Sequence, residues 1–479
     1  MVSKSSAIRL LFVILVLGFL VRLYRFDSPI ADWHSWRQAD TSAVSRNFAT
    51  YGFDILHPRF DDLSNVPSGL ENPRGYRFVE FPIYNIAQAG LFRIFGVITI
   101  EEWGRLITIL TSLAGSFFLY KIVSKYSGET AGLASAFFYT FLPFNIYYGR
   151  TILPDPTMVA TLLSSIYFFS RWIDSKTKPW SILSAATILL AVSLLLKPYA
   201  LFYALVFLAL IYKEFGTGMF KQLKLYIFAL VAVVPLIAWR LWITNYPEGI
   251  PASAWLFNGN GIRFRPAFFR WIGYERLIKL ISGYIGIILV IFGLYQLRFE
   301  KARLLYSAFL LSSSIYVVVL ATGNVQHDYY QIVIMPSVAI IFGLGARFLL
   351  ESKKISFFHF NRLLLAFIIF IAFSMSWLQV RDYFNINNRS IVIAGEAIDR
   401  MIPKDAKIIA NYNGDTSFLY QTKRKGWASF EKPLPEMITM GADYLALANP
   451  TKVDEGLGQT YKIIKKTKDY LLLDLHRKP

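Results

Sequence analysis

Cysteine is absent from the 479 residues, which excludes disulfide bonds, thiolate metal sites and cysteine nucleophiles. Charged residues are also scarce, because Asp, Glu, Lys and Arg together make up only 17% of the chain. A soluble domain carries about 25%. The acidic residues are the rarer kind, with 31 Asp and Glu against 50 Lys and Arg. This composition disfavours a water-soluble globular protein.

Long apolar runs stand where the charges are missing, and 55% of the residues are hydrophobic with a mean hydropathy of +0.43. A helix that crosses a bilayer core needs roughly 20 apolar residues. The sequence therefore predicts an α-helical polytopic membrane protein with about eleven spans. They lie near residues 7–24, 104–123, 130–148, 156–172, 180–196, 198–213, 225–244, 277–297, 304–321, 330–349 and 362–380. The first block lacks a small-residue cleavage site, so we expect a retained helix and not a removed signal peptide.

Lysine and arginine cluster in every second loop between these blocks. The clusters are Lys4 and Arg9; Lys121 and Lys125; Arg171, Lys176 and Lys178; Lys213, Lys221 and Lys224; Arg298, Lys301 and Arg303; and Arg347, Lys353 and Lys354. Cytoplasmic loops carry an excess of such residues, so these loops and the N-terminus are predicted to be cytoplasmic. The same topology accounts for the formal charge of +19, so no nucleic-acid partner is predicted.

The remaining loops are predicted to be extracytoplasmic. They are residues 25–103, 150–156, 197–198, 245–276 and 323–329, and everything after about residue 381. The apolar segment 82–97 would place the later basic loops outside if it crossed the membrane. It is therefore predicted to be an interfacial or re-entrant helix.

The last hundred residues differ from the rest of the chain. Residues 408–412, 444–448 and 470–475 have the pattern of short strands, with a helix-compatible stretch at 433–440 between them. We therefore predict a transmembrane domain at 1–380, including the 25–103 loop, and a small extracytoplasmic α/β domain at 381–479.

Ionisable and aromatic polar residues near the span ends gather on the predicted outer face. They are Asp32, His34, Arg37, Asp40, Arg46, Glu80, Arg150, Asp155, Lys197, His327, Asp328 and Tyr329. Each has an ordinary structural interpretation: Asp40 as a helix N-cap, Lys197 as a lysine reaching the interface, and His327 with Asp328 as a cap. Independent caps would be spread over both faces, so the common location favours a functional site.

Sugar transfer from a lipid phosphate needs this combination of groups. A carboxylate takes the proton of the attacking hydroxyl, and cations stabilise the leaving phosphate. The lipid tail of the donor stays in the bilayer, so such a site lies at the membrane surface.

The residues also resemble a family. The strings Trp36-Arg-Gln-Ala-Asp40-Thr41, Glu80-Phe-Pro-Ile-Tyr84, Arg150 to Pro156, Lys197 and His327-Asp-Tyr-Tyr330 occur in the family's order. They are similar to the family-39-like glycosyltransferases of the GT-C class, which include aminoarabinose transferases and protein O-mannosyltransferases. The resemblance covers roughly residues 5–380.

The resemblance implies roles for individual residues. Asp40 matches the catalytic aspartate of the first loop, and Asp155 matches a second acidic position that holds the acceptor or a metal ion. Lys197 and His327 match positions associated with the lipid phosphate, and Asp328 and Tyr329 belong to the same late motif. A polyprenyl-phosphate sugar is the implied donor, and a divalent metal ion is left open.

Two departures from the family pattern keep alternatives open. The first-loop motif differs from the usual Asp-Glu form, so Asp32 is a second candidate for the base. Glu80-Phe-Pro stands where many members have Lys-Pro-Pro, so Arg37, Arg74 or Arg150 would supply the missing cation.

Two other functions are compatible with a polytopic membrane protein. A transporter or flippase places ionisable groups or broken helices near the bilayer midplane. Only Pro235 and Arg240 in the seventh predicted span suggest this, and the acidic residues lie at the span ends, which disfavours transport. The second alternative function is that of a non-catalytic assembly protein for cell-wall polysaccharide. The sequence therefore favours a multi-pass cell-membrane glycosyltransferase whose acceptor is a lipid, a glycan or a protein.

Overall fold

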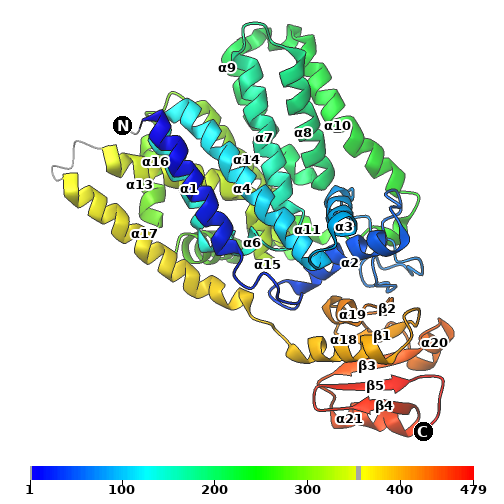
Figure 1. Ribbon diagram of the computed structural model, residues 1–479. Coiled ribbons are helices and arrows are strands. Elements are labelled where there is room, and N and C mark those ends of the chain that lie inside the picture. The colour runs from blue at the N-terminus through cyan, green and yellow to red at the C-terminus, as the bar shows by residue number, and fades with distance from the viewer. Residues whose placement is uncertain (1–2, 352–357) are drawn as a thin grey trace. The chain divides into compact units, whose positions relative to one another are not determined.

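The computed structural model describes residues 3–351 and 358–479 (Figure 1). The predicted cytoplasmic lysines Lys353 and Lys354 lie outside the described residues. The chain forms two compact units, each built from segments that are distant in the sequence. The first unit comprises Met1–Phe26, Leu106–Trp239 and Ser253–Asp382, and the second comprises Asp27–Arg105, Arg240–Ala252 and Tyr383–Pro479.

The first unit is helical. Its helices, including two that extend past its borders, are α1 (Lys4–Arg22), α4 (Ile100–Ser127), α5 (Glu129–Phe141), α6 (Pro143–Tyr148), α7 (Asp155–Asp174), α8 (Trp180–Leu196), η1 (Pro198–Tyr203), α9 (Ala204–Phe215), η2 (Gly216–Lys221), α10 (Leu223–Ile243), α11 (Trp255–Asn258), η4 (Gly259–Phe264), α12 (Pro266–Phe269), η5 (Arg270–Ile281), α13 (Ile287–Leu297), α14 (Arg303–Val319), α15 (Ala321–Gln326), η6 (Asp328–Ile334), α16 (Met335–Glu351) and α17 (Phe358–Val380). Helix α7 packs along α8 (Figure 1). Helix α16 packs against α5 and α13.

Within the described residues, six helical segments are long and apolar enough to cross a membrane by length and composition alone, and three of them join consecutive helices of the fold. They are Lys4–Arg22, Ile100–Ser127, Pro198–Lys221, Leu223–Ile243, Asp328–Glu351 and Phe360–Met401. Shorter apolar helices lie at Trp180–Leu196, Ile287–Leu297 and Arg303–Val319. The helical membrane-type fold is thus confirmed, and the number of about eleven spans stays a prediction.

Two predicted continuous helices are interrupted. The block 130–148 breaks at Leu142, which is extended because Pro143 follows it and disfavours the helical conformation. The block 277–297 breaks at Gly283, where φ is +51°, and a Cβ would lie 1.9 Å from the carbonyl oxygen of Ala372. Only glycine fits this close approach of the turn between η5 and α13 to helix α17.

The second unit joins the long first loop to the C-terminal residues. Its elements are α2 (Ser35–Tyr51), α3 (Ile83–Phe95), η3 (Pro247–Gly249), α18 (Arg389–Met401), β1 (Ile408–Asn411), α19 (Ser417–Thr422), β2 (Gly426–Trp427), α20 (Leu434–Thr439), β3 (Tyr444–Ala448), α21 (Lys452–Gly456), η8 (Leu457–Gln459), β4 (Lys462–Lys466) and β5 (Tyr470–Asp474); η7 (Arg381–Phe384) begins before its border. The predicted segment 82–97 contains α3, whose 13 residues are too few to span a bilayer core. Its location in a membrane interface stays a prediction.

The C-terminal strands form a five-stranded sheet in the order β2-β1-β3-β5-β4 (Figure 1). Strands β1, β2 and β3 are parallel, and β5 and β4 continue the sheet in antiparallel fashion. Alternate side chains face two cores: Ile408 and Leu472 belong to one, while Ile409, Leu445 and Leu473 belong to the other. The three predicted strands are confirmed, whereas β2 and β4 were not predicted. Strand β2 has only two residues, and every residue of the lysine-rich β4 is exposed, so neither strand alternates between buried apolar and exposed polar residues.

The first loop pairs with the edge of this sheet. Asp62 forms a parallel bridge with Gly426, and the Leu63 amide donates to the Gly426 carbonyl at 2.7 Å. A Cβ on Gly426 would lie 1.7 Å from the carbonyl oxygen of Ile408, so this position accepts only glycine. The predicted domain border at residue 380 remains a prediction. The structure adds that the loop and the C-terminal residues pack in one unit.

Candidate functional site

Helix α2 is unusual because its polar residues are buried. Arg37, Gln38 and Asp40 are each less than 5% exposed, and α3 and α19 pack against the helix. Burying polar groups costs free energy unless they are hydrogen-bonded. The helix therefore depends on partners from other segments of the second unit.

Asp40 has such partners on both carboxylate oxygens. Its Oδ2 accepts a hydrogen bond from Arg77 Nη2 at 2.5 Å, and its Oδ1 accepts one from the Thr416 hydroxyl at 2.7 Å. Arg77 comes from the first loop, and Thr416 precedes α19 in the C-terminal segment. Asp40 is the sixth residue of α2, so the alternative that it caps the helix N-terminus is wrong.

The other predicted residues of the second unit lie around the same helix. Arg37 forms a buried ion pair with Glu80, and Gln38 donates to Asp32 Oδ1 at 2.7 Å. Asn387 donates to the backbone carbonyl of Asp32 at 2.9 Å. Arg74, another candidate for the missing phosphate-binding cation, donates to the Tyr76 hydroxyl at 3.2 Å. Asp32, Arg37, Asp40 and Glu80 therefore belong to one polar region.

Sequence reasoning did not single out Arg77, Thr416 or the neighbouring carboxylates Asp61 and Asp62. Asp61 pairs with Arg46, and Asp62 accepts from the amide and hydroxyl of Ser64 at 3.0 and 2.8 Å. The adjacent pair Asp61-Asp62 in the first loop was a visible signal for a carboxylate site. Thr416 gave no local signal, because it lies 376 residues from Asp40.

A small cavity of about 10 Å³ lies between these groups, which is room for about one water molecule. Its lining includes Asp40, Asp61, Asp62, Thr416 and Tyr420. Burial raises the pKa of Asp62 to about 7, and the nearby charge of Asp40 adds to this, although the Ser64 hydrogen bonds oppose it. Asp62 is therefore a carboxyl group that holds its proton at weakly acidic pH.

This pKa predicts how stability depends on pH. The folded protein binds a proton at Asp62 between about pH 4 and 7, where the unfolded chain does not. Stability from this group is therefore lost as the pH rises toward 7. We expect the Tm of the wild-type protein in detergent to fall more between pH 5 and 8 than the Tm of Asp62→Asn. Asp399→Asn, which removes a carboxylate paired with Arg424, is the control. Its Tm should fall between pH 5 and 8 by as much as the Tm of the wild-type protein. Equal pH dependence in Asp62→Asn and wild type would contradict the assignment.

The first unit contains the other group of predicted residues. Asp155 is the first residue of α7, between Pro154 and Pro156, and is 1% exposed. Lys197 follows α8 and precedes η1. Its Nζ lies 3.9 Å from Asp155 Oδ2, and the lysine is also buried. The structure thus brings together two charges that are 42 residues apart.

Aromatic rings connect this ion pair to the late motif. Lys197 Nζ lies 5.5 Å from the centroid of the Tyr199 ring, which lies 5.9 Å from that of Tyr330. His327 lies 6.3 Å from the Tyr330 ring and stacks on Tyr329 at 5.6 Å. Lys197, His327 and Tyr329 therefore belong to one cluster of cationic and aromatic groups.

Asp328 and Arg150 lie beside two further tyrosines. The Tyr148 hydroxyl donates to Asp328 Oδ1, and Tyr148 packs edge-on against Tyr147 at 5.0 Å. The Arg150 guanidinium lies 5.7 Å from the Tyr147 ring and donates to the backbone carbonyl of Arg25 at 2.8 Å. The predicted residues of the first unit thus form two groups of contacts, and Asp328 joins them because it stands between His327 and Tyr329 in the sequence.

No group of three or more His, Asp or Glu side chains suited to a metal ion occurs in the part of the chain that the structure describes. A divalent ion remains a proposal.

Comparison with a family model identifies one segment of the chain. Residues 80–242 match the family described as dolichyl-phosphate-mannose-protein mannosyltransferase. The segment contains Glu80, Arg150, Asp155 and Lys197. No curated protein sequence matches the chain significantly.

Solved structures resemble the whole chain. ArnT from Cupriavidus metallidurans bound to undecaprenyl phosphate has a TM-score of 0.68 at 12% identity, covering 99% of this chain and 98% of that one. The oligosaccharyltransferase AglB from Archaeoglobus fulgidus, in complex with an inhibitory peptide and a dolichol-phosphate, has a TM-score of 0.59 at 11% identity. The match covers 91% of this chain and 69% of that one. The arabinofuranosyltransferase AftD from Mycobacteria has a TM-score of 0.57 at 12% identity. The match covers 98% of this chain and 42% of that one. At these identities the likeness establishes the fold, and the predicted resemblance to GT-C glycosyltransferases is confirmed.

Proposed function

We propose that this chain, which has the GT-C glycosyltransferase fold and a segment of the protein mannosyltransferase family, transfers a sugar from a polyprenyl-phosphate donor to an acceptor hydroxyl. The reaction takes place at the outer face of the cell membrane. The observation that carries the proposal is the buried Lys197–Asp155 pair, because it places a cation and a carboxylate inside the family-matched segment.

The chemistry is a substitution at the anomeric carbon of the sugar. The acceptor oxygen forms a bond to this carbon as the bond to the phosphate oxygen breaks, and the electron pair of that bond leaves with polyprenyl phosphate. The acceptor proton passes to a carboxylate. Attack from the side opposite the phosphate inverts the configuration of the carbon.

Each group of residues supplies one part of this chemistry. Lys197 and His327 bind the phosphate, with Arg150 nearby, and Lys197 offsets the charge that develops on it. Asp155 holds Lys197 and orients the acceptor or a divalent ion. Asp40 accepts the proton as general base, and Asp32 is the alternative base in the same polar region. Arg37 is already paired with Glu80, so Arg150 is the better candidate for a second phosphate cation.

A proteoliposome assay separates this function from a flippase. Vesicles carry the protein and polyprenyl-phosphate sugars labelled in the sugar, with membrane extract as acceptor source. A transferase moves the label from the lipid fraction to another molecule. A flippase moves intact donor between leaflets and leaves the label on the lipid, and this result would overturn the proposal.

Thr416 is expected to position Asp40. Thr416→Val preserves the side-chain shape and removes the hydroxyl that donates to Asp40 Oδ1. An unsatisfied buried acceptor costs about 1–3 kcal/mol. We therefore expect kcat to fall about tenfold or more, with the KM for the donor unchanged.

Thr422→Val is the matched control, because Thr422 is buried in α19 and donates to the carbonyl of Leu419. It should leave kcat near the wild-type value. A similar loss in both variants would show that Thr416 supports only the fold of this segment.

A further inference from the structure

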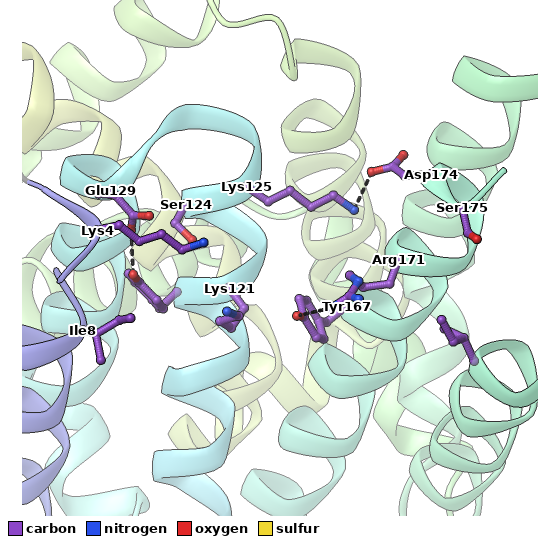
Figure 2. Close-up of a pocket in the computed structure, with 12 residues that line it drawn as sticks. Lys4, Ile8, Lys121, Ser124, Lys125, Glu129, Tyr167, Arg171, Asp174 and Ser175 are labelled. Atoms are coloured by element: carbon purple, nitrogen blue, oxygen red, sulfur yellow. Dashed lines mark hydrogen bonds and ion pairs between the residues drawn. The ribbon is translucent and has the colours of Figure 1, made fainter.

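A second polar cavity lies in the first unit, at the end of the helices where the loops are basic (Figure 2). Its volume is about 570 Å³, which lies within the usual size of a ligand site. Its charged lining residues are Lys4, Lys121, Lys125, Glu129, Arg171 and Asp174. None of these residues belongs to the proposed catalytic groups.

The cavity is distant from the proposed donor site. Helix α7 begins with Asp155 and carries Arg171 in its last turn. Sixteen residues at a rise of 1.5 Å separate them by about 24 Å, which approaches the thickness of a bilayer core. The same helix thus reaches both places but cannot present one ligand to both.

The basic groups of the cavity outnumber its carboxylates, four against two. The Lys125 ammonium already has partners for its charge and its hydrogen bonds. Its Nζ lies 2.7 Å from Asp174 Oδ2 and donates to the carbonyl and hydroxyl of Ser170. Glu129 accepts a hydrogen bond from the Tyr120 hydroxyl at 2.5 Å. Both carboxylates therefore have partners of their own.

The other three cations have no ion pair among the residues that the structure describes. They come from three helices, Lys4 from α1, Lys121 from α4 and Arg171 from α7 (Figure 2). Lys121 Nζ and the Arg171 guanidinium each lie 6.0 Å from the centroid of the Tyr167 ring. Basic residues that only mark a cytoplasmic loop need not converge, whereas these surround one cavity.

An apolar path leads away from the cations. Ile8 lines the cavity and is 56% exposed, and Phe12, one turn further along α1, is 67% exposed. Helix α1 is one of the helices apolar enough to span a membrane. Acyl chains lying along this face would be next to a headgroup in the cavity.

We propose that this cavity binds the phosphate headgroup of an anionic phospholipid. Lys121 and Arg171 contact the phosphate, Lys4 closes the site from α1, and the acyl chains lie against Ile8 and Phe12. Basic pockets between membrane helices are suited to such headgroups. The site is separate from sugar transfer, so its test measures binding and not turnover.

The test uses the purified full-length protein in a neutral detergent and counts bound lipid by native mass spectrometry. The probes are dioctanoyl phosphatidylglycerol, dioctanoyl phosphatidylcholine and inorganic phosphate. We expect one retained phosphatidylglycerol and no retained phosphatidylcholine. Lys121→Gln/Arg171→Gln should bind phosphatidylglycerol at least about tenfold more weakly, since each such charge contributes about 1 kcal/mol, which is roughly fivefold.

Lys221→Gln/Arg303→Gln is the matched control, because it removes the same charges from exposed positions outside the cavity. It should bind like wild type, and Lys121→Arg should retain binding. Equal binding of both lipids, or no loss in the cavity variant with unchanged Tm, would overturn the proposal. If inorganic phosphate binds as tightly as phosphatidylglycerol, the cavity binds a free anion. This result would overturn the proposal that the bound phosphate belongs to a lipid headgroup.

Discussion

Lys197→Ala is expected to lower kcat for sugar transfer by about 10²- to 10³-fold, the effect of removing one group that stabilises developing charge. In the wild-type protein the Lys197 ammonium is buried beside Asp155 and the Tyr199 ring, where little water screens it. Its charge then acts strongly on a departing phosphate. Initial rates at saturating donor measure the effect.

A structural role of the lysine must be separated from this catalytic one. Loss of one partner of a buried ion pair costs about 3–5 kcal/mol of stability, so Lys197→Ala is also expected to lower Tm. Asp155→Asn/Lys197→Met removes both charges and should restore much of the Tm, but not the activity. Recovery of turnover in the double variant would contradict phosphate binding by Lys197.

Asp40→Asn is expected to reduce kcat by about 10²- to 10⁴-fold, the usual contribution of a general base. The amide is close in size to the carboxylate but cannot accept the acceptor proton. Arg77 and Thr416 fix both carboxylate oxygens, so the side chain is held in one orientation. Single-turnover rates with labelled donor measure this loss directly.

Two variants show whether the effect belongs to Asp40. Asp32→Asn should have a much smaller effect, because Gln38 still holds that position. Asp399→Asn removes a paired carboxylate of the C-terminal segment and should leave kcat unchanged. A large loss in Asp32→Asn with activity in Asp40→Asn would make Asp32 the base.

The helical fold and the three apolar strands were predictable because both depend on local periodicity. Tyr444–Ala448 alternates between two cores, and its bounds match the predicted strand. Strand β4 was not predictable in this way, since all five residues are exposed. The break at Gly283 depends on the close approach of Ala372, a contact that no local pattern reveals.

The candidate site shows the same limit more strongly. Asp40, Asp155 and Lys197 could be named as candidates from the sequence because charges are scarce and because they match motifs of the family that the chain resembles. Thr416 was not, because its contact with Asp40 exists only once the C-terminal segment packs on α2. The ion pair between Arg37 and Glu80 likewise required the structure, and it changes which cation is available for phosphate.

The measurement that tests the central claim most directly is the stoichiometry of the reaction. Purified protein is incubated with a panel of polyprenyl-phosphate sugars and membrane extract, and both the transferred sugar and the released polyprenyl phosphate are quantified. The account predicts one polyprenyl phosphate for each sugar transferred, and neither product with Asp40→Asn. If every polyprenyl-phosphate sugar of the panel remains intact although the protein is folded, the result would contradict the proposed sugar transfer.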